Sequence, residues 1–393
     1  KIFLHLEYFF LYEVPMAKSI VYTPRIRKSP FYEGTLKAGV TSFTVYNHMF
    51  LPTLYKSHED DYRSLVEDVS LWDVGAERQV QIEGEDAAAF VQYLTPRNLS
   101  TFKDGFCRYC LLTDENGGIV NDPLVLKFNN NKFWLSIADT DVLLWCKGIA
   151  LNSKFKVKVT EPEACPLALQ GPKSFDMMRE ICNDDESIMN LKYYQFVETE
   201  LFNIPVVIAR SGWSNQNGYE IYIINETDGN PLWDKLMEAG APYKIAPGSP
   251  NQIDRIEAGM VSHLGDTTLE DNPLELNLPK FCDLEQEADF IGKEALKKIQ
   301  AKGIEKQFTG FKISGEKIGY NLRRMEIKDD KGITQGFISS CIYSPTFGCN
   351  IGLGFVKFDK ISSTETFKST IDEEDRDVQI VALPFSSRLE KMK

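Results

Sequence analysis

The segment that most constrains the fold is residues 208–222, with the sequence Ile-Ala-Arg-Ser-Gly-Trp-Ser-Asn-Gln-Asn-Gly-Tyr-Glu-Ile-Tyr. An apolar run over residues 204–209 leads into it, and an alternating run over residues 219–224 closes it. This order predicts a strand, a glycine-bearing loop and a second strand. The segment carries an indole, several side-chain amides, a carboxylate and two phenols. We expect such a loop to hold a planar polar ligand together with a cationic group.

The rest of the chain mixes helical and strand patterns, with turns of hairpin length between them. Helical patterns cover residues 60–72, 86–93, 174–181 and 231–239. Strand patterns cover residues 79–82, 109–112, 119–128 and 133–137. This mixture predicts the α+β class rather than a doubly wound parallel sheet.

The pattern of the sequence changes after residue 302. Short strand patterns with turn residues between them follow at residues 308–313, 324–329, 333–342, 351–358 and 378–383. They are typical of a small β-barrel or sandwich. We therefore place a domain boundary near residue 300, with two α+β subdomains in residues 16–300 and a C-terminal β-barrel domain in residues 301–393.

Composition excludes several classes of function. A net charge of −13 and a pI near 5.0 argue against nucleic-acid binding, and no apolar run is long enough to span a bilayer. Residues 1–15 interrupt their apolar stretches with charges, so we expect an extension that is disordered or not native. The scattered cysteines suit a reducing, cytoplasmic compartment. We expect Cys107 and Cys110 to be buried free thiols and the chain to hold no metal.

A second motif lies at residues 116–125, Asn-Gly-Gly-Ile-Val-Asn-Asp-Pro-Leu-Val. Alone, a Gly-Gly turn followed by polar residues indicates a hairpin. Together with residues 208–222 it resembles two segments of the folate-binding aminomethyltransferase family, the T-protein of glycine cleavage: Gly-Gly-Ile-x-Asp-Asp-Leu and Arg-Thr-Gly-Tyr-Thr-Gly-Glu-x-Gly-Phe-Glu-Ile. Residues 254–260 and 344–354 extend the resemblance, which runs in one order over residues 28–386.

The resemblance implies the T-protein fold, a C-terminal β-barrel and a site for tetrahydrofolate. Glu220 is expected to bind the N–H groups of the pterin, because a carboxylate matches such a fork of donors. The residues that the resemblance places at the folate are Tyr109, Asp122, Gln216, Glu220 and Arg255.

The departures from the family pattern indicate the chemistry. Asn121 replaces the first acid of the Asp-Asp pair, and an amide cannot take a proton as a carboxylate does. Residues 213–216 read Trp-Ser-Asn-Gln in place of Tyr-Thr-Gly-Glu, and Ala138 stands where a folate-adjacent Asn is expected. This pattern resembles the dimethylsulfoniopropionate demethylases, a branch of the family that moves a methyl group from a sulfonium to tetrahydrofolate, giving 3-(methylthio)propanoate and 5-methyltetrahydrofolate.

That resemblance implies a small zwitterionic sulfonium as substrate. An aromatic face attracts a soft cation, and Trp offers the best such face. We expect Trp213 and Tyr222 to form the cage; Phe43 is the remaining candidate, although core packing explains it better. Since a thioether leaves readily, Asn121 marks a reaction that needs no carboxylate, and a flat activity profile across neutral pH is expected.

Two rival functions remain. An ordinary aminomethyltransferase would need a lipoyl-carrier partner and an acid in place of Asn121. A folate-binding assembly factor without turnover would carry a Lys-Gly-Cys-Tyr-x-Gly-Gln-Glu segment, which the sequence does not contain. Beyond the small-molecule substrate, a homodimer is a further expectation.

Overall fold

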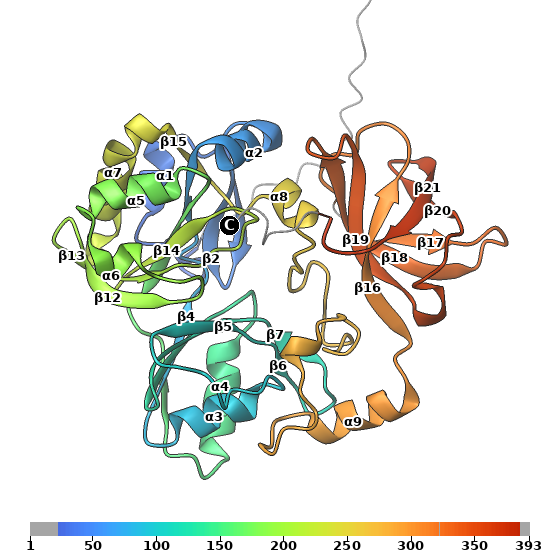
Figure 1. The fold of residues 1–393 in the computed structure, drawn as a ribbon, viewed down its shortest axis with the longest axis horizontal. Coiled ribbons are helices and arrows are strands. Elements are labelled where there is room, and N and C mark those ends of the chain that lie inside the picture. Colours follow the sequence, from blue (N-terminus) through green and yellow to red (C-terminus); the bar gives the residue numbers. More distant parts are fainter. Residues whose placement is uncertain (1–22, 322, 386–393) are drawn as a thin grey trace, which may run out of the picture.

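The computed structural model describes residues 23–321 and 323–385, which form three lobes (Figure 1). Two lobes are built around open sheets, and the third is a closed barrel reached through helix α9 (Lys293–Lys302). The α+β class with a C-terminal barrel is confirmed. The expected extension, residues 1–15, lies outside the described residues. Within the described ranges, every helix is too short or too polar to cross a bilayer.

The first lobe contains a six-stranded sheet in the order β12-β13-β14-β11-β3-β15. Its strands are β12 (Phe196–Leu201), β13 (Ile204–Ala209), β14 (Gly218–Ile223), β11 (Cys165–Gln170), β3 (Val69–Asp73) and β15 (Ile245–Gly248). All neighbours are antiparallel except β3 and β15. The strand–loop–strand expected over residues 208–222 is the connection between β13 and β14, near the middle of this sheet.

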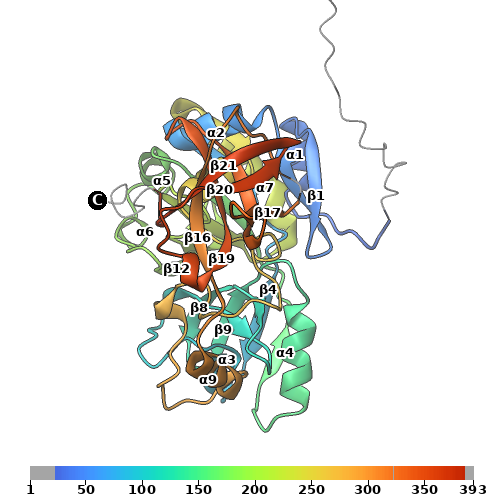
Figure 2. The same ribbon diagram turned by 90° about the vertical axis from the view of Figure 1, so that its right-hand side faces the viewer.

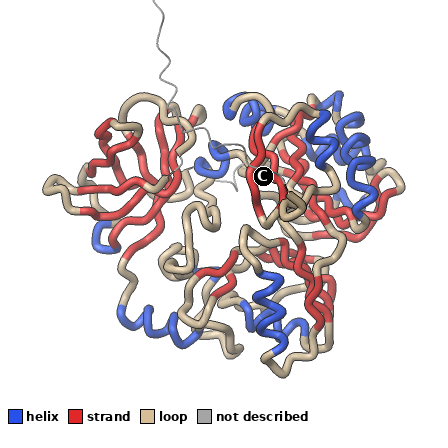
Figure 3. The backbone as a smooth tube through the Cα atoms, turned by 180° about the vertical axis from the view of Figure 1, so that it is seen from behind, coloured by secondary structure: helices blue, strands red, loops and turns tan. Residues whose placement is uncertain are grey.

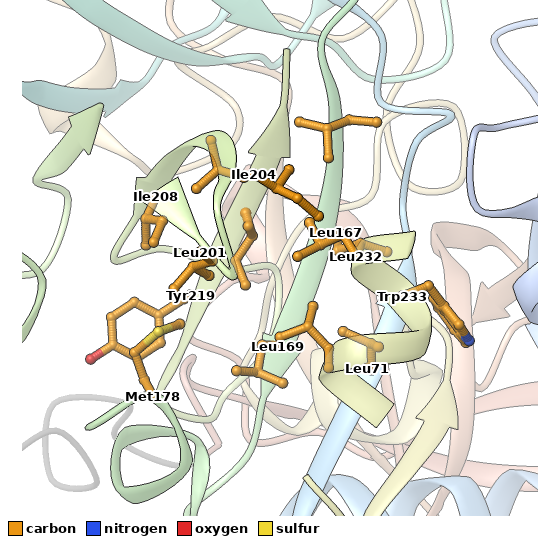
Figure 4. Close-up of a cluster of buried hydrophobic side chains, with 14 of the residues drawn as sticks. Leu71, Leu167, Leu169, Met178, Leu201, Ile204, Ile208, Tyr219, Leu232 and Trp233 are labelled. Carbon is orange, nitrogen blue, oxygen red and sulfur yellow. The ribbon is translucent and has the colours of Figure 1, made fainter. Parts of the chain in front are cut away.

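Helices cover the outer face of this sheet, away from the barrel (Figures 1 and 3). They are α1 (Tyr32–Lys37), α5 (Ser174–Ile181), α6 (Glu186–Met189) and α7 (Gly229–Ala239). Met178 from α5 and Leu232 and Trp233 from α7 pack on strand residues such as Leu169 (Figure 4). The other face carries the ribbon of β1 (Ser42–Tyr46) and β2 (Met49–Leu54), and the short helices α2 (His58–Glu67) and α8 (Gln252–Glu257) lie toward the barrel.

The second lobe contains a five-stranded sheet in the order β10-β4-β9-β8-β5, below the barrel in Figure 2. Its strands are β10 (Lys158–Thr160), β4 (Gln79–Glu83), β9 (Lys132–Ser136), β8 (Leu124–Asn129) and β5 (Phe106–Tyr109). The helices α3 (Ala87–Leu94) and α4 (Val142–Leu151) pack on it through Phe90, Leu94 and Val142. A two-stranded ribbon, β6 (Leu112–Thr113) with β7 (Ile119–Asn121), carries the Gly-Gly turn.

The barrel closes in the order β16-β19-β18-β17-β20-β21. Its strands are β16 (Lys306–Ile313), β17 (Met325–Lys328), β18 (Thr334–Ser344), β19 (Cys349–Lys357), β20 (Phe367–Ile371) and β21 (Glu374–Val381). Strand β20 was not predicted. Its inward side holds Phe367, Ser369 and Ile371, so only two apolar residues mark it within a polar stretch.

Three sequence predictions were wrong in detail. The strand expected over residues 109–112 is interrupted at Cys110 and Leu111, which separate β5 from β6. The helix expected over residues 60–72 ends at Glu67, and Val69–Asp73 form strand β3, buried along its whole length between β11 and β15. A strand buried on both faces shows no alternation, so its pattern cannot be told from that of a buried helix. The strand expected over residues 119–128 is broken at Asp122 and Pro123, and its halves join different sheets.

Candidate functional site

A cavity of about 610 Å³ lies where the three lobes meet, within the range of roughly 300–1,000 Å³ that is usual for small-molecule sites. The first lobe contributes Phe43 from β1 and Glu220 from β14, the second lobe contributes Ser136 from β9, and the barrel domain contributes Tyr320. Aromatic and carboxylate side chains therefore face one space, although they come from segments far apart in the sequence.

The loop between β13 and β14 is held against the sheet by Gln170. The Gln170 amide donates to the backbone oxygens of Ser211 and Tyr219, and it accepts from the Ser214 hydroxyl at 2.6 Å. Gly212 allows this close approach: it has φ +158°, and a Cβ there would lie 2.2 Å from the Gln170 side chain. The loop is therefore built to one conformation, with its backbone fixed beside the cavity.

Glu220 lies in the cavity wall and is held from behind. Its carboxylate accepts hydrogen bonds from the Ser211 hydroxyl and, at 3.1 Å, from the Tyr222 hydroxyl. Tyr222 is fully buried, packs against Trp134 and does not line the cavity. Its position is that of a residue that orients Glu220, whereas contact with a ligand was expected from the sequence.

Tyr109 and Asp122 form a second polar group in the wall. The Tyr109 hydroxyl donates to Asp122 at 3.0 Å. Burial raises the pKa of Asp122 to about 7, although the bond from Tyr109 lowers it. The pKa of Tyr109 is raised well above its usual value, first by burial and then by the Asp122 charge. The raised pKa of Asp122 lies in the neutral range, whereas a flat activity profile across neutral pH was expected from the sequence.

Asn121 faces away from the cavity. Its side chain is fully buried: the amide nitrogen donates to the backbone oxygen of Ala138 at 3.0 Å and to the Thr140 hydroxyl at 2.7 Å, and the amide oxygen accepts from the Ala138 nitrogen at 3.0 Å. Strand β7 ends at Asn121, and Asp122, the next residue, lines the cavity, whereas Asn121 does not. The Asn121 amide fixes the segment that follows β9, whose Ala138 lines the cavity.

Trp213 lines the cavity and is half-buried. The guanidinium carbon of Arg255 lies 5.9 Å from the centre of its ring, close enough for a cation–π contact. Arg255 is 1% exposed, does not line the cavity, and forms an ion pair of 2.7 Å with Asp266 and a hydrogen bond to Ser340 of the barrel. One cation already contacts the indole, and it is fixed by the junction between barrel and first lobe.

Gln216 also lies behind the wall. Its side-chain nitrogen donates to Asp254 at 2.9 Å, and the Asn215 backbone nitrogen donates to the same carboxylate at 2.6 Å. Of the residues expected in the site, Tyr109, Asp122, Trp213 and Glu220 line the cavity. Those that support the wall from behind are Asn121, Gln216, Tyr222 and Arg255.

Several residues in the wall were not predicted from the sequence, notably Tyr46, Asp61 and Glu77. Asp61 accepts from the backbone nitrogens of Tyr55 and Lys56 at 3.0 and 3.3 Å, and burial raises its pKa. Glu77 sits beside a basic residue in a turn, a pattern that usually indicates a solvent-exposed pair. No local signal distinguishes it, because its place depends on which loops the fold brings together.

The charge of the described wall is one-sided. It contains Asp61, Glu77, Asp122 and Glu220 but no lysine or arginine among the described lining residues. Burial lowers the pKa of His263, also in the wall, to about 4, so this imidazole is neutral at neutral pH. Such a space favours ligands that bring positive charge or N–H donors. Among the described residues, no cluster of three or more His, Cys, Asp or Glu side chains is arranged to hold a metal, and Cys107 and Cys110 are buried and free.

Comparisons with known proteins agree with this architecture. Residues 31–286 match the GCVT N-terminal domain, and residues 306–386 match the glycine cleavage T-protein C-terminal barrel domain. Dimethylsulfoniopropionate demethylase DmdA of Ruegeria pomeroyi is 38% identical, over 86% of this chain and 91% of its own length. An aminomethyltransferase of Clostridium botulinum is 31% identical over 78% and 83%, and one of Caldanaerobacter subterraneus is 28% identical over 84% and 88%.

A solved structure has the same fold. The glycine cleavage system aminomethyltransferase T of Bartonella henselae superimposes with a TM-score of 0.81 over 92% of this chain and 99% of its own, at 22% identity. The two domain matches together cover most of the chain, in the order that the structure shows. The chain therefore belongs to the glycine cleavage T-protein family.

Proposed function

We propose that this protein transfers a methyl group from dimethylsulfoniopropionate to N5 of tetrahydrofolate, giving 3-(methylthio)propanoate and 5-methyltetrahydrofolate. The observation that carries the proposal is a cavity whose described wall combines Trp213 with several carboxylates and has no lysine or arginine. Aromatic faces and carboxylates both favour a permanent cation. The higher identity to the demethylase (38%) than to the aminomethyltransferases (28 and 31%) supports the same substrate.

The residues present fit a folate. Phe43, Tyr46, Tyr109 and Trp213 give the cavity flat aromatic surfaces on which a pterin can stack. Glu220, fixed by two hydroxyl donors, keeps acceptor capacity for the N–H groups of the pterin edge. When bound, tetrahydrofolate supplies the amine that accepts the methyl group.

In the transfer, the carbon–sulfur bond breaks and leaves its electron pair on the thioether sulfur. A carbon–nitrogen bond forms, and the amine releases a proton. Trp213 and the carboxylates of the wall bind the sulfonium, and Glu220 orients the acceptor. Asp122, with its pKa near 7, is suited to take up the released proton. In-line placement of donor and acceptor, which displace water from the cavity as they bind, supplies the rest of the acceleration.

The second candidate is an aminomethyltransferase of the glycine cleavage system, favoured by the retained Asp122. The first acid of the family pair is absent. The Asn121 amide that replaces it already forms hydrogen bonds with the backbone of Ala138 and the hydroxyl of Thr140. This leaves Asp122 as the carboxylate of that segment that faces the cavity.

One assay separates these functions. The protein is incubated with tetrahydrofolate and dimethylsulfoniopropionate, and 5-methyltetrahydrofolate and 3-(methylthio)propanoate are measured by chromatography. Equal amounts of both products support the proposal. A second incubation supplies an aminomethylated lipoyl carrier in place of the sulfonium. Methylenetetrahydrofolate from the second mixture alone would establish the aminomethyltransferase, and no product from either would leave a folate-binding protein without turnover.

Two further expectations belong to this proposal. The described cysteines are free thiols, which supports a cytoplasmic location. A homodimer is part of the proposal as well, and sedimentation at micromolar concentration measures it.

A further inference from the structure

Glu77 is the one carboxylate of the cavity wall to which no described residue donates a hydrogen bond. Asp61 has two backbone donors, Asp122 has the Tyr109 hydroxyl, and Glu220 has two hydroxyl donors. For Glu77, only the backbone is engaged: its nitrogen donates to the Val74 oxygen at 2.8 Å, and its oxygen accepts from the Gln79 side chain at 2.7 Å. Glu77 is half-buried and lines the cavity, so its carboxylate is open to a ligand that enters this space.

The neighbours of Glu77 offer no compensating charge. The adjacent Arg78 turns to Glu161, which also pairs with Arg27, so its guanidinium is already neutralised. The other charges that act on Glu77 are the carboxylates Glu220 and Asp122, and burial together with their repulsion raises the pKa of Glu77 well above its usual value. Like charges this close resist simultaneous ionisation, so the empty cavity favours the protonated acid, and an incoming cation stabilises the ionised carboxylate of Glu77.

Resting on the proposed function, we propose that Glu77 is the counter-charge of the substrate's sulfonium and the main source of selectivity for the charged substrate over the neutral thioether product. The indole of Trp213 alone is insufficient for this task, because Arg255 already contacts its ring. A ring contact accounts for about 2- to 30-fold in affinity. A carboxylate about 5 Å from a cation in a partly buried site accounts for on the order of 100-fold.

The selectivity serves turnover as well as binding. The methyl donor is a cation, whereas the thioether product has lost that charge. A fixed carboxylate therefore holds the substrate and releases the product, whose remaining carboxylate it repels. This role needs the charge of Glu77 and leaves folate recognition to Glu220.

The test compares binding of two ligands that differ by one methyl cation. Isothermal titration calorimetry without folate measures dimethylsulfoniopropionate and 3-(methylthio)propanoate against the wild type, Glu77→Gln and Glu77→Asp. Glu198→Gln is the matched control, because Glu198 is exposed on β12, outside the described cavity wall. We expect Glu77→Gln to weaken sulfonium binding by on the order of 10- to 100-fold and to change thioether binding little. Glu77→Asp should keep most of the preference, and Glu198→Gln all of it.

Three results overturn the inference. Equal losses for sulfonium and thioether would show that Glu77 only shapes the cavity. Weaker binding of folic acid with unchanged sulfonium binding would assign Glu77 to the pterin. A wild type with no preference for the sulfonium would remove the selectivity itself. Thermal unfolding of each variant establishes that it is folded, and we expect no loss for Glu77→Gln, since its side chain bonds to no described residue.

The proposed function and the role of Glu77 can be refuted independently of each other. A wild type that prefers the sulfonium yet yields no methylated folate would refute the methyl transfer and leave Glu77 as a cation site. A wild type that methylates folate while Glu77→Gln keeps its selectivity would refute the inference and leave the function standing.

Discussion

Replacement of Trp213 tests whether the indole contributes to cation binding. The ring lines the cavity, is half-buried, and has the Arg255 guanidinium 5.9 Å from its centre. A cation–π contact is worth about 0.5–1 kcal/mol at exposed sites and about 2 kcal/mol when dry. Because the ring is partly dry and already contacts one cation, we expect Trp213→Ala to weaken substrate binding by about 1–2 kcal/mol. This corresponds to roughly a 5- to 30-fold rise in KM. Trp213→Phe keeps an aromatic face and should cost less than Trp213→Ala.

The assay must separate charge from contact area. Trp213→Ala also removes apolar wall, and that loss weakens binding of the thioether product and of the sulfonium alike. The difference between the two ligands isolates the cation–π part. Trp145→Ala is the matched control, because Trp145 is also half-buried but lies on α4 in the second lobe, outside the described wall. Wild-type kinetics for both Trp213 variants would show that the ring is structural, and equal losses for the two ligands would show that it contributes area alone.

Three more predictions follow from the wall. Glu220→Gln should weaken folate binding measured by calorimetry but leave ligand-free stability nearly unchanged, because Ser211 and Tyr222 can donate to the amide oxygen as well; unchanged folate affinity would refute the assignment. Asn121→Asp loses two donated bonds and buries a charge, so we expect a stability loss of at least about 1–3 kcal/mol by denaturant unfolding and no gain in kcat; a markedly higher kcat would contradict the reasoning. The pKa of Asp122 is raised to about 7 in the fold, so its stabilising contribution is complete below about pH 4 and disappears as the pH rises through 7. Asp122→Asn should therefore raise the thermal midpoint relative to wild type at pH 8 and less at pH 5, and an equal effect at both values would place the pKa elsewhere.

Local patterns predicted most elements because their burial is periodic. Helix α5 and strand β13 occupy the residues that their apolar spacing indicated. Strand β3 escaped because all its residues are buried, and β20 escaped because a serine occupies one of its inward positions. Both failures have one cause. A strand is recognised in the sequence by the difference in polarity between its two faces, and in both strands this difference is too small.

Only those residues of the candidate site that belong to family motifs could be predicted from the sequence. These motifs found Trp213 and Glu220 in the wall, but they could not say which motif residues touch the cavity. Asn121 and Asp122 adjoin in sequence and point to opposite sides, which depends on where β7 ends. Glu77 has no motif, and only the meeting of three lobes makes it part of the site.

Helix α8 explains why a barrel that adds so little to the cavity wall still matters to it. Three charged residues of this six-residue helix are each about 1% exposed. Asp254 holds the loop after β13, and Arg255 joins Trp213 to Asp266 and to the barrel. Glu257 binds Tyr62 of α2 and Ser344 of β18. Removing one partner of a buried charge lowers the stability of the protein by several kcal/mol. These bonds therefore fix α8 between the lobes. The position of the Trp213 ring is thereby set by contacts that span both domains.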